Sequence, residues 1–291
     1  KKQKHLTFLK RVLDFYINSS IHVAFAVLSF CFLTVFELNL KLSPIFYVSV
    51  FCASVLGYNF VKYFGIAKFY YHSLTTKLKY IQLVSLLSAI SFLYTFLMLQ
   101  TLSQMLLFFL GLITFLYAIP LGIKPPKNLR SLGGVKIYVI AIVWTGASVV
   151  LPILESQSVL LLDHLLIAIQ RIFVLIVLML PFEIRDLELD EAYLSTIPQK
   201  IGITNTKLIG CALLSDSLIL EFFKQQTNME STLVLVFTIT ILAILLIKST
   251  NLRSRYYTSF LVESVLPSIT TYSVFLGDGD NNGKSFSIGS D

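Results

Sequence analysis

Charged side chains are scarce in this chain of 291 residues. Only 13% of the residues are Asp, Glu, Lys or Arg, whereas 56% are hydrophobic. A typical soluble domain has about a quarter of its residues charged. The mean hydropathy of +0.79 is also more apolar than that of soluble domains. The composition therefore excludes a soluble globular domain and predicts an integral membrane protein.

Cysteine is also rare. Cys31, Cys52 and Cys211 lie in separate apolar stretches without a CxxC spacing, so neither a disulfide framework nor a cysteine metal site is indicated. The formal net charge of +7 does not indicate nucleic acid, because basic residues of membrane proteins gather in cytoplasmic loops and near anionic lipid headgroups. We expect membrane lipid as a partner and no nucleic acid. The sequence has no detectable inverted repeat, which argues against a transporter.

Apolar runs of about 20 residues, the length that crosses a bilayer as a helix, recur along the whole chain. They cover residues 17–38, 43–64, 81–100, 103–122, 136–154, 159–182, 205–223, 230–248 and 255–276. The sequence thus predicts an all-α, polytopic bundle of about nine transmembrane helices, forming one domain over residues 1–276. The sequence predicts a disordered polar tail over residues 277–291. Its DGDNNG resembles the start of a calcium-binding loop, but Gly289 occupies the position of the final acidic ligand, so we expect no calcium site.

Lysine and arginine alternate between the connections of these spans. Most of the 23 basic residues fall in the N-terminal arm and in the connections after the second, fourth, sixth and eighth spans. By the positive-inside rule, these segments, including the N-terminus, face the cytoplasm. We expect the protein in the cytoplasmic (inner) membrane of a bacterium, with any chemistry that needs water on its cytoplasmic face.

Three carboxylates stand at the cytoplasmic end of the sixth span. Glu183, Asp186 and Asp190 are spaced i, i+3 and i+7, so at roughly 100° per residue they project from one face of a helix. Acids gathered in this way repel each other, and oxygen ligands of this kind suit Mg²⁺, which is usually bound by one or two carboxylates, waters and substrate phosphates. The pattern predicts a magnesium site, with a plain charged loop as the alternative.

The cytoplasmic connections also carry basic residues among prolines and glycines. Lys124 and Arg130 lie in the connection after the fourth span, and Lys200 follows the acidic segment. Cationic side chains at a membrane-facing cavity can neutralise a diphosphate, while the apolar bundle can house an isoprenoid chain. The alternative is that positive-inside topology alone explains these charges.

The acidic segment resembles that of the UbiA family of intramembrane prenyltransferases, and the resemblance extends over most of the chain. EIRDLELDEAYLSTIPQKIG, residues 183–202, is similar to the family's DxxDxxxD motif, which is followed by a basic-Thr-Leu-Pro stretch and Leu-Gly. The resemblance implies an all-helical enzyme that transfers a prenyl group from a prenyl diphosphate to a lipophilic acceptor, using Mg²⁺. It implies Asp186 and Asp190 as catalytic metal ligands, with Glu183 as an auxiliary ligand.

The first acidic motif of that family is missing. Asn59 fits its asparagine, but Phe60, Tyr63 and Ala67 occupy the aspartate positions, and no acid occurs between residues 39 and 100. Two negative charges at low dielectric need compensation, and cationic side chains are the available substitute for one metal ion.

We therefore expect several polar residues to contact the diphosphate. These are Asn59, Lys62, Lys124, Arg130 and Lys200. Ionisation of an allylic diphosphate needs strong stabilisation of the leaving group, a task that metal ions perform well. Two functions stay open: an active UbiA-like transferase, and a catalytically silent relative that binds an isoprenoid or quinone lipid.

Arg171 is a guanidinium inside the sixth span. It lies 12 residues before Glu183, hence about 18 Å deeper along the helix, where an unpaired charge is costly. Counting depth along the other spans predicts Glu263 as its partner, or Asp216. Its expected role is a brace between helices or a polar floor of the cavity.

Overall fold

The computed structural model describes residues 14–69, 76–119, 134–159, 161–187, 196–225, 227 and 229–250. All regular secondary structure within these ranges is helical, and seven of the helices are long and apolar enough to cross a membrane. The predicted all-α, polytopic membrane bundle is thus confirmed. The expected ninth span and the polar tail lie outside the described residues.

The helices follow the predicted apolar runs. They are α2 (Ile21–Glu37), α3 (Pro44–Phe69), α4 (Thr76–Phe96), α5 (Thr101–Ala118), α6 (Val135–Thr145), the π-helical η2 (Gly146–Val150), α7 (Leu151–Glu155), α8 (Leu162–Asp186), α9 (Ile197–Glu221) and α10 (Met229–Ile247). Together α6, η2 and α7 form one span over Val135–Glu155. Every described span in the predicted set thus contains a helix.

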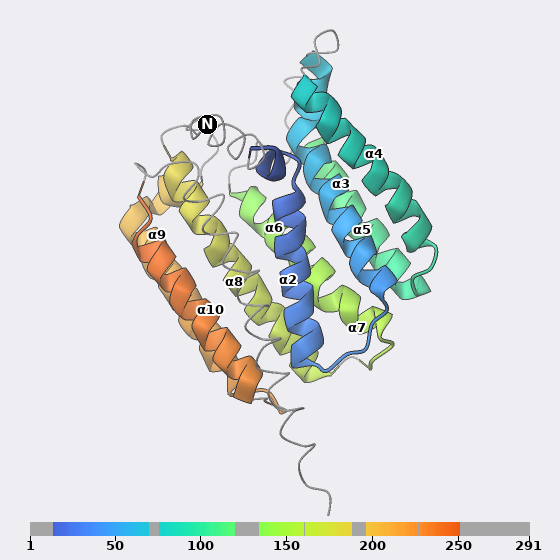
Figure 1. Ribbon diagram of the computed structural model, residues 1–291. Coiled ribbons are helices and arrows are strands. Elements are labelled where there is room, and N and C mark those ends of the chain that lie inside the picture. The colour runs from blue at the N-terminus through green and yellow to red at the C-terminus, as the bar shows by residue number, and fades with distance from the viewer. Residues whose placement is uncertain are drawn as a thin grey trace, which may run out of the picture.

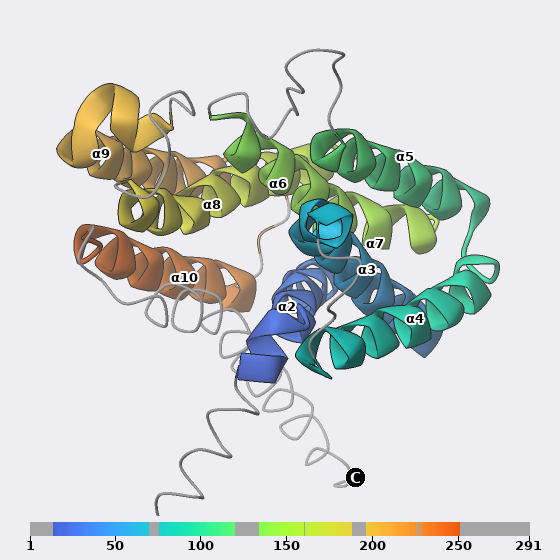
Figure 2. The ribbon, with the colours of Figure 1, turned by 90° about the horizontal axis from the view of Figure 1, so that it is seen from above.

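The bundle consists of two rows of helices (Figures 1 and 2). One row runs α9, α8, α6 and α5, and the other runs α10, α2, α3 and α4. The centre of the apolar core lies on α8, where Leu175, Leu178 and Ile184 are fully buried. By contrast, α4 and α5 expose many leucines and phenylalanines, as surfaces that face lipid do.

Local irregularities shape the helices around the centre. Pro181 lies inside α8, and Gly202 adopts a φ of 79° inside α9, so that α9 is kinked there. In η2 the backbone makes one wide turn, and the Cys31 thiol donates a hydrogen bond to the carbonyl oxygen of Ala147 at 3.3 Å. Such wide turns recur at functional sites of helices, and η2 borders the cavity described next.

Candidate functional site

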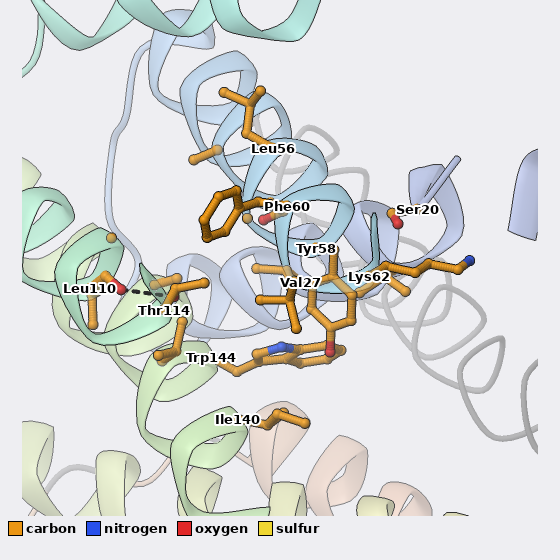
Figure 3. A pocket seen from close by; sticks show the side chains of 18 of the residues that line it. Ser20, Val27, Leu56, Tyr58, Phe60, Lys62, Leu110, Thr114, Ile140 and Trp144 are labelled. Atoms are coloured by element: carbon orange, nitrogen blue, oxygen red, sulfur yellow. Dashed lines mark hydrogen bonds between the residues drawn. The ribbon is translucent and has the colours of Figure 1, made fainter. Parts of the chain in front are cut away.

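A cavity of about 860 Å³ lies between α2, α3, α5 and α6. This volume falls in the range of small-molecule sites, about 300–1,000 Å³. The walls are mainly apolar, and Figure 3 shows Val27, Leu56, Phe60, Leu110 and Ile140 around it. The walls are apolar because these membrane helices carry apolar side chains on all sides, including the sides that face one another.

Aromatic rings form part of the cavity wall. Trp144, which is 3% exposed, meets the Tyr58 ring with centroids 6.0 Å apart, and behind it the Phe30 ring at 6.2 Å. On the opposite wall, Phe60 of α3 stacks on Phe115 of α5 at 5.8 Å. Aromatic faces attract positive charge, so these walls suit an apolar chain or a developing carbocation.

Polar groups line one end of the cavity, which we call the mouth. Its charged members are Asp14, Lys62, Lys136 and Arg185. Lys62 Nζ donates to the carbonyl oxygen of Asn18 at 3.2 Å and to that of Ile17 at 3.4 Å. The mouth therefore carries three cationic side chains and, among the lining residues that are described, a single carboxylate.

The predicted acidic face is divided between two different sets of contacts. Glu183 is 3% exposed, and its Oε2 accepts a hydrogen bond from the backbone N–H of Ile197 at 3.2 Å. Asp186 accepts hydrogen bonds from Nε and Nη2 on one edge of the Arg185 guanidinium, at 2.6 and 2.7 Å, the bidentate geometry of a strong charge-assisted pair. Neither carboxylate belongs to the cavity lining.

These contacts bear on the expected magnesium site. In the part of the chain that the structure describes, no group of three or more His, Cys, Asp or Glu residues could hold a metal ion. Glu183 and Asp186 alone do not fit a metal centre, because both bind protein groups. Asp190 lies outside the described residues, so the metal and catalytic roles of the three acids stay predictions.

The other expected substrate contacts have different positions. Lys62 lines the cavity mouth. Asn59 is buried and joins three helices: its Oδ1 accepts from Ser20 at 2.7 Å, and its Nδ2 donates to Ser85 at 2.9 Å. Lys200 is exposed on α9. The roles predicted for these three residues toward a diphosphate stay predictions.

Two further basic residues expected at the site, Lys124 and Arg130, lie outside the described residues. The structure adds two members that were not among the expected substrate contacts, Lys136 at the start of α6 and Arg185 near the end of α8. Both were visible in the sequence as basic residues at the ends of spans. The missing information was the direction in which each side chain points.

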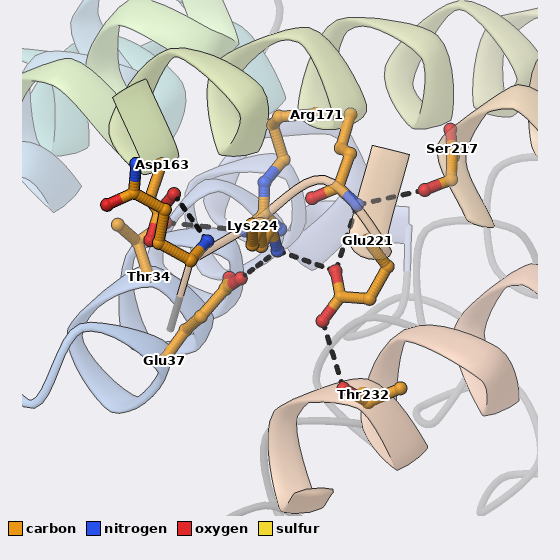
Figure 4. Close-up of polar contacts among 10 residues, drawn as sticks. Thr34, Glu37, Asp163, Arg171, Ser217, Glu221, Lys224 and Thr232 are labelled. Carbon is orange, nitrogen blue, oxygen red and sulfur yellow. Dashed lines mark hydrogen bonds and ion pairs between the residues drawn. The ribbon is translucent and has the colours of Figure 1, made fainter. Parts of the chain in front are cut away.

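A second polar cluster lies at the other end of the bundle, between α2, α8, α9 and α10 (Figure 4). Lys224 donates to Glu37 at 2.5 Å and to Glu221 at 2.6 Å. Glu221 also accepts from Gln170 at 3.0 Å and from Thr232 at 2.9 Å. The charged groups thus neutralise each other, as buried charges must, and the cluster joins helices far apart in the sequence.

Arg171 belongs to this end of the bundle. Its guanidinium lies over the Phe30 ring at 4.7 Å and donates to Thr34 Oγ1 at 3.3 Å, and the charge of Glu37 acts on it. The prediction of a pair with Asp216 is wrong, because Asp216 is exposed on α9 and no ion pair among the described residues joins the two. Glu263 lies outside the described residues.

Comparison with known proteins finds similarity in structure. No family model and no curated protein matches the sequence. A UbiA homologue from Archaeoglobus fulgidus bound to GPP and Mg²⁺ matches with a TM-score of 0.61 and 10% identity, covering 89% of this chain and 99% of that one. A UbiA homologue from Aeropyrum pernix K1, in its apo form, matches with a TM-score of 0.59 and 13% identity, over 87% and 97%.

A digeranylgeranylglyceryl phosphate synthase matches over 91% of this chain and 96% of its own, with a TM-score of 0.55 and 14% identity. The chain therefore has the fold of UbiA homologues, and the resemblance inferred from the acidic segment is confirmed at the level of the fold.

Proposed function

We propose that this protein is a UbiA-like membrane prenyltransferase, which moves a prenyl group from a prenyl diphosphate to a lipophilic acceptor. The observation that supports this proposal most strongly is the apolar cavity of about 860 Å³ with a cationic mouth. A prenyl diphosphate has the complementary form, an apolar chain with an anionic head. One solved structure with the same fold is bound to GPP and Mg²⁺, which supports this class of ligand.

The geometry suits the transfer as follows. The prenyl chain lies along the apolar wall, and the diphosphate lies at the mouth near Lys62 and Arg185. The bond between C1 of the prenyl group and the diphosphate oxygen breaks, and the diphosphate leaves with the electron pair. The allylic cation faces the rings of Tyr58 and Trp144. The acceptor attacks this cation and loses one proton, which the departed diphosphate accepts.

Magnesium is the cofactor that the fold implies, since it would neutralise the leaving diphosphate. The ligands that the resemblance implies are Glu183, Asp186 and Asp190, the last of which lies outside the described residues. The two described carboxylates are bound to the Ile197 N–H and to Arg185, so none of the steps above is assigned to the metal.

A second function is favoured by a specific observation. Asp186 is neutralised by Arg185, and the aromatic residues Phe60 and Tyr63 stand where the family has acids. Leaving-group stabilisation is usually the largest contribution to catalysis of this type. A protein without it would bind an isoprenoid or quinone lipid in the same cavity without turnover.

Release of diphosphate separates the two functions. The purified full chain in lipid nanodiscs would be given labelled prenyl diphosphates, Mg²⁺ and a lipid extract as the source of acceptor. The comparison variant is Gly111→Trp, because a Cβ at Gly111, which lines the cavity, would meet nothing within 4 Å, so the indole can occupy the cavity.

A transferase releases diphosphate above background, and the Gly111→Trp variant does not. Binding without release by the wild type identifies the silent lipid-binding protein. Failure of every prenyl diphosphate to bind would contradict the transferase.

A further inference from the structure

The described charged residues that line the cavity mouth are mostly basic, whereas the residues that bind a metal ion are mostly acidic. A cation site built from protein needs carboxylates that point to one place. Of the described residues that line the mouth, Asp14 is the single acid, against Lys62, Lys136 and Arg185. Among the described lining residues positive charge therefore exceeds negative charge, although the charge of Arg185 is balanced by Asp186 beside it.

The three cations come from three different helices. Lys62 belongs to α3, Lys136 to the first turn of α6, and Arg185 to the last turn of α8. Because these helices are fixed by the core, the cations remain at the mouth without a long loop to hold them. The start of α6 at Val135 adds the positive end of a helix dipole to the same region.

Phe60 on α3 stands where the resemblance implies an acidic metal ligand. Its ring turns into the cavity and stacks on Phe115, so this position serves the apolar chain of a ligand. Two residues later, Lys62 reaches the mouth and is oriented by the carbonyl oxygens of Ile17 and Asn18. Position 60 thus contributes apolar wall, and position 62 contributes positive charge.

Arg185 and Asp186 complete the arrangement. The guanidinium is paired with the neighbouring carboxylate, and the two side chains are 15% and 22% exposed. A phosphate group offers the guanidinium the same bidentate contact as a carboxylate. Asp186 therefore competes with a phosphate for Arg185, whereas a metal ligand would assist phosphate binding.

We infer that the mouth binds the diphosphate of an isoprenoid ligand directly through Lys62, Lys136 and Arg185, so that binding does not require a divalent cation. The inference rests on the proposed function, in that it concerns the donor of the same cavity. The ligand class is an isoprenoid diphosphate: the apolar wall requires the chain, and three cations require more than one negative charge.

Binding of a tritiated farnesyl diphosphate probe tests the inference. The full chain in phosphatidylcholine nanodiscs, which offer no anionic lipid as competitor, is titrated once with EDTA and once with Mg²⁺. We expect affinities that agree within about tenfold. Lys62→Met and Lys136→Met should each weaken binding by roughly tenfold to a hundredfold, because each removes a charge-assisted hydrogen bond.

Three variants serve as controls. Lys79→Met makes the same charge change at an exposed position of α4 outside the cavity lining, and binding should not change. Lys62→Arg keeps the charge and should retain most of the affinity. Asp186→Asn, which removes the ion pair of Arg185, should tighten binding, because the carboxylate no longer competes with the phosphate for the guanidinium.

The outcomes distinguish this inference from the proposed function. Binding that needs Mg²⁺ and is lost in Asp186→Asn would overturn the cationic mouth and leave the prenyltransferase proposal standing. No binding under either condition would remove both. Competition by inorganic diphosphate as strong as that by the prenyl compound would show a superficial anion site and would also overturn the inference.

Discussion

Replacement of Lys224 by methionine should destabilise the protein strongly. The ammonium group lies between Glu37 and Glu221, at 2.5 and 2.6 Å, and the Lys224 side chain is 3% exposed. Methionine fills a similar volume but removes the positive charge. The two carboxylates are then left facing each other in a region that excludes most water.

The size of the destabilisation depends on the polar contacts that Glu37 and Glu221 keep after Lys224 is replaced. Loss of one member of a buried ion pair costs about 3–5 kcal/mol of unfolding free energy. Glu221 keeps its hydrogen bonds from Gln170 and Thr232, and Glu37 keeps the nearby charge of Arg171. We therefore expect the lower end, about 3 kcal/mol, which for a chain of this size corresponds to a fall in Tm of roughly 6–12 °C.

The assay uses the single tryptophan of the chain. Trp144 is 3% exposed, so its fluorescence reports loss of the core when the purified protein is heated in detergent at a fixed scan rate. Lys41→Met is the matched control, because Lys41 is exposed in the connection between α2 and α3, and its Tm should equal that of the wild type.

A double variant makes the test specific. Lys224→Met with Glu221→Gln removes both charges, so it should be less destabilised than Lys224→Met alone. A Tm for Lys224→Met within about 1 °C of the wild type, or a double variant whose loss is the sum of the two single losses, would refute the reasoning.

Other variants give further expected outcomes. Asn59→Ala removes the amide that joins α2 and α4 to α3 and should cost about 1–3 kcal/mol of stability, measured as a lower Tm. Gly210→Ala should cost about 1–3 kcal/mol, because its Cβ would lie 2.9 Å from Leu180 and closer still to Leu246; unchanged stability would contradict this packing. A Cβ at position 111 would meet nothing within 4 Å. Gly111→Ala should therefore keep or raise the Tm, because alanine is favoured over glycine in a helix by about 1 kcal/mol of unfolding free energy.

The bundle was predictable because helices in lipid must satisfy their own backbone hydrogen bonds. Runs of about 20 apolar residues can do this only as spanning helices, so each described helix has its predicted run. The wide turn inside 136–154 was not predicted: Pro152 follows η2 by two residues, but a proline inside an apolar run does not say that the turn before it contains one extra residue.

The site was harder to predict because helical periodicity does not say which neighbour a side chain meets. Glu183 and Asp186 share a helix face, as their spacing predicted. Nevertheless Glu183 is used by the first N–H of α9, and Asp186 by Arg185 next to it in the chain. The preference of a carboxylate for an adjacent guanidinium was available in the sequence, whereas the contact with Ile197 depends on how α8 and α9 meet.

The partners of Arg171 show the same limit. Depth along the bundle required a polar neighbour at this level and named two residues: Asp216, which is exposed on α9, and Glu263, which lies outside the described residues and stays a prediction. The observed neighbours, Phe30, Thr34 and Glu37, all belong to α2. Depth cannot identify which helix lies adjacent, because the order of helices in space differs from their order in the chain.

The wide turn of η2 has a consequence for the length of its span. A chain with one residue fewer between Gly146 and Val150 would close this turn into a regular α-helix while α6 and α7 keep their orientations, because the wide turn accommodates one extra residue. Pro152 and Ile153, both buried, would then stay near their positions, and the loss would fall on the contact of Ala147 with Cys31. A deletion in η2 should therefore be milder than a deletion elsewhere in the span, which would rotate every later residue by about 100°.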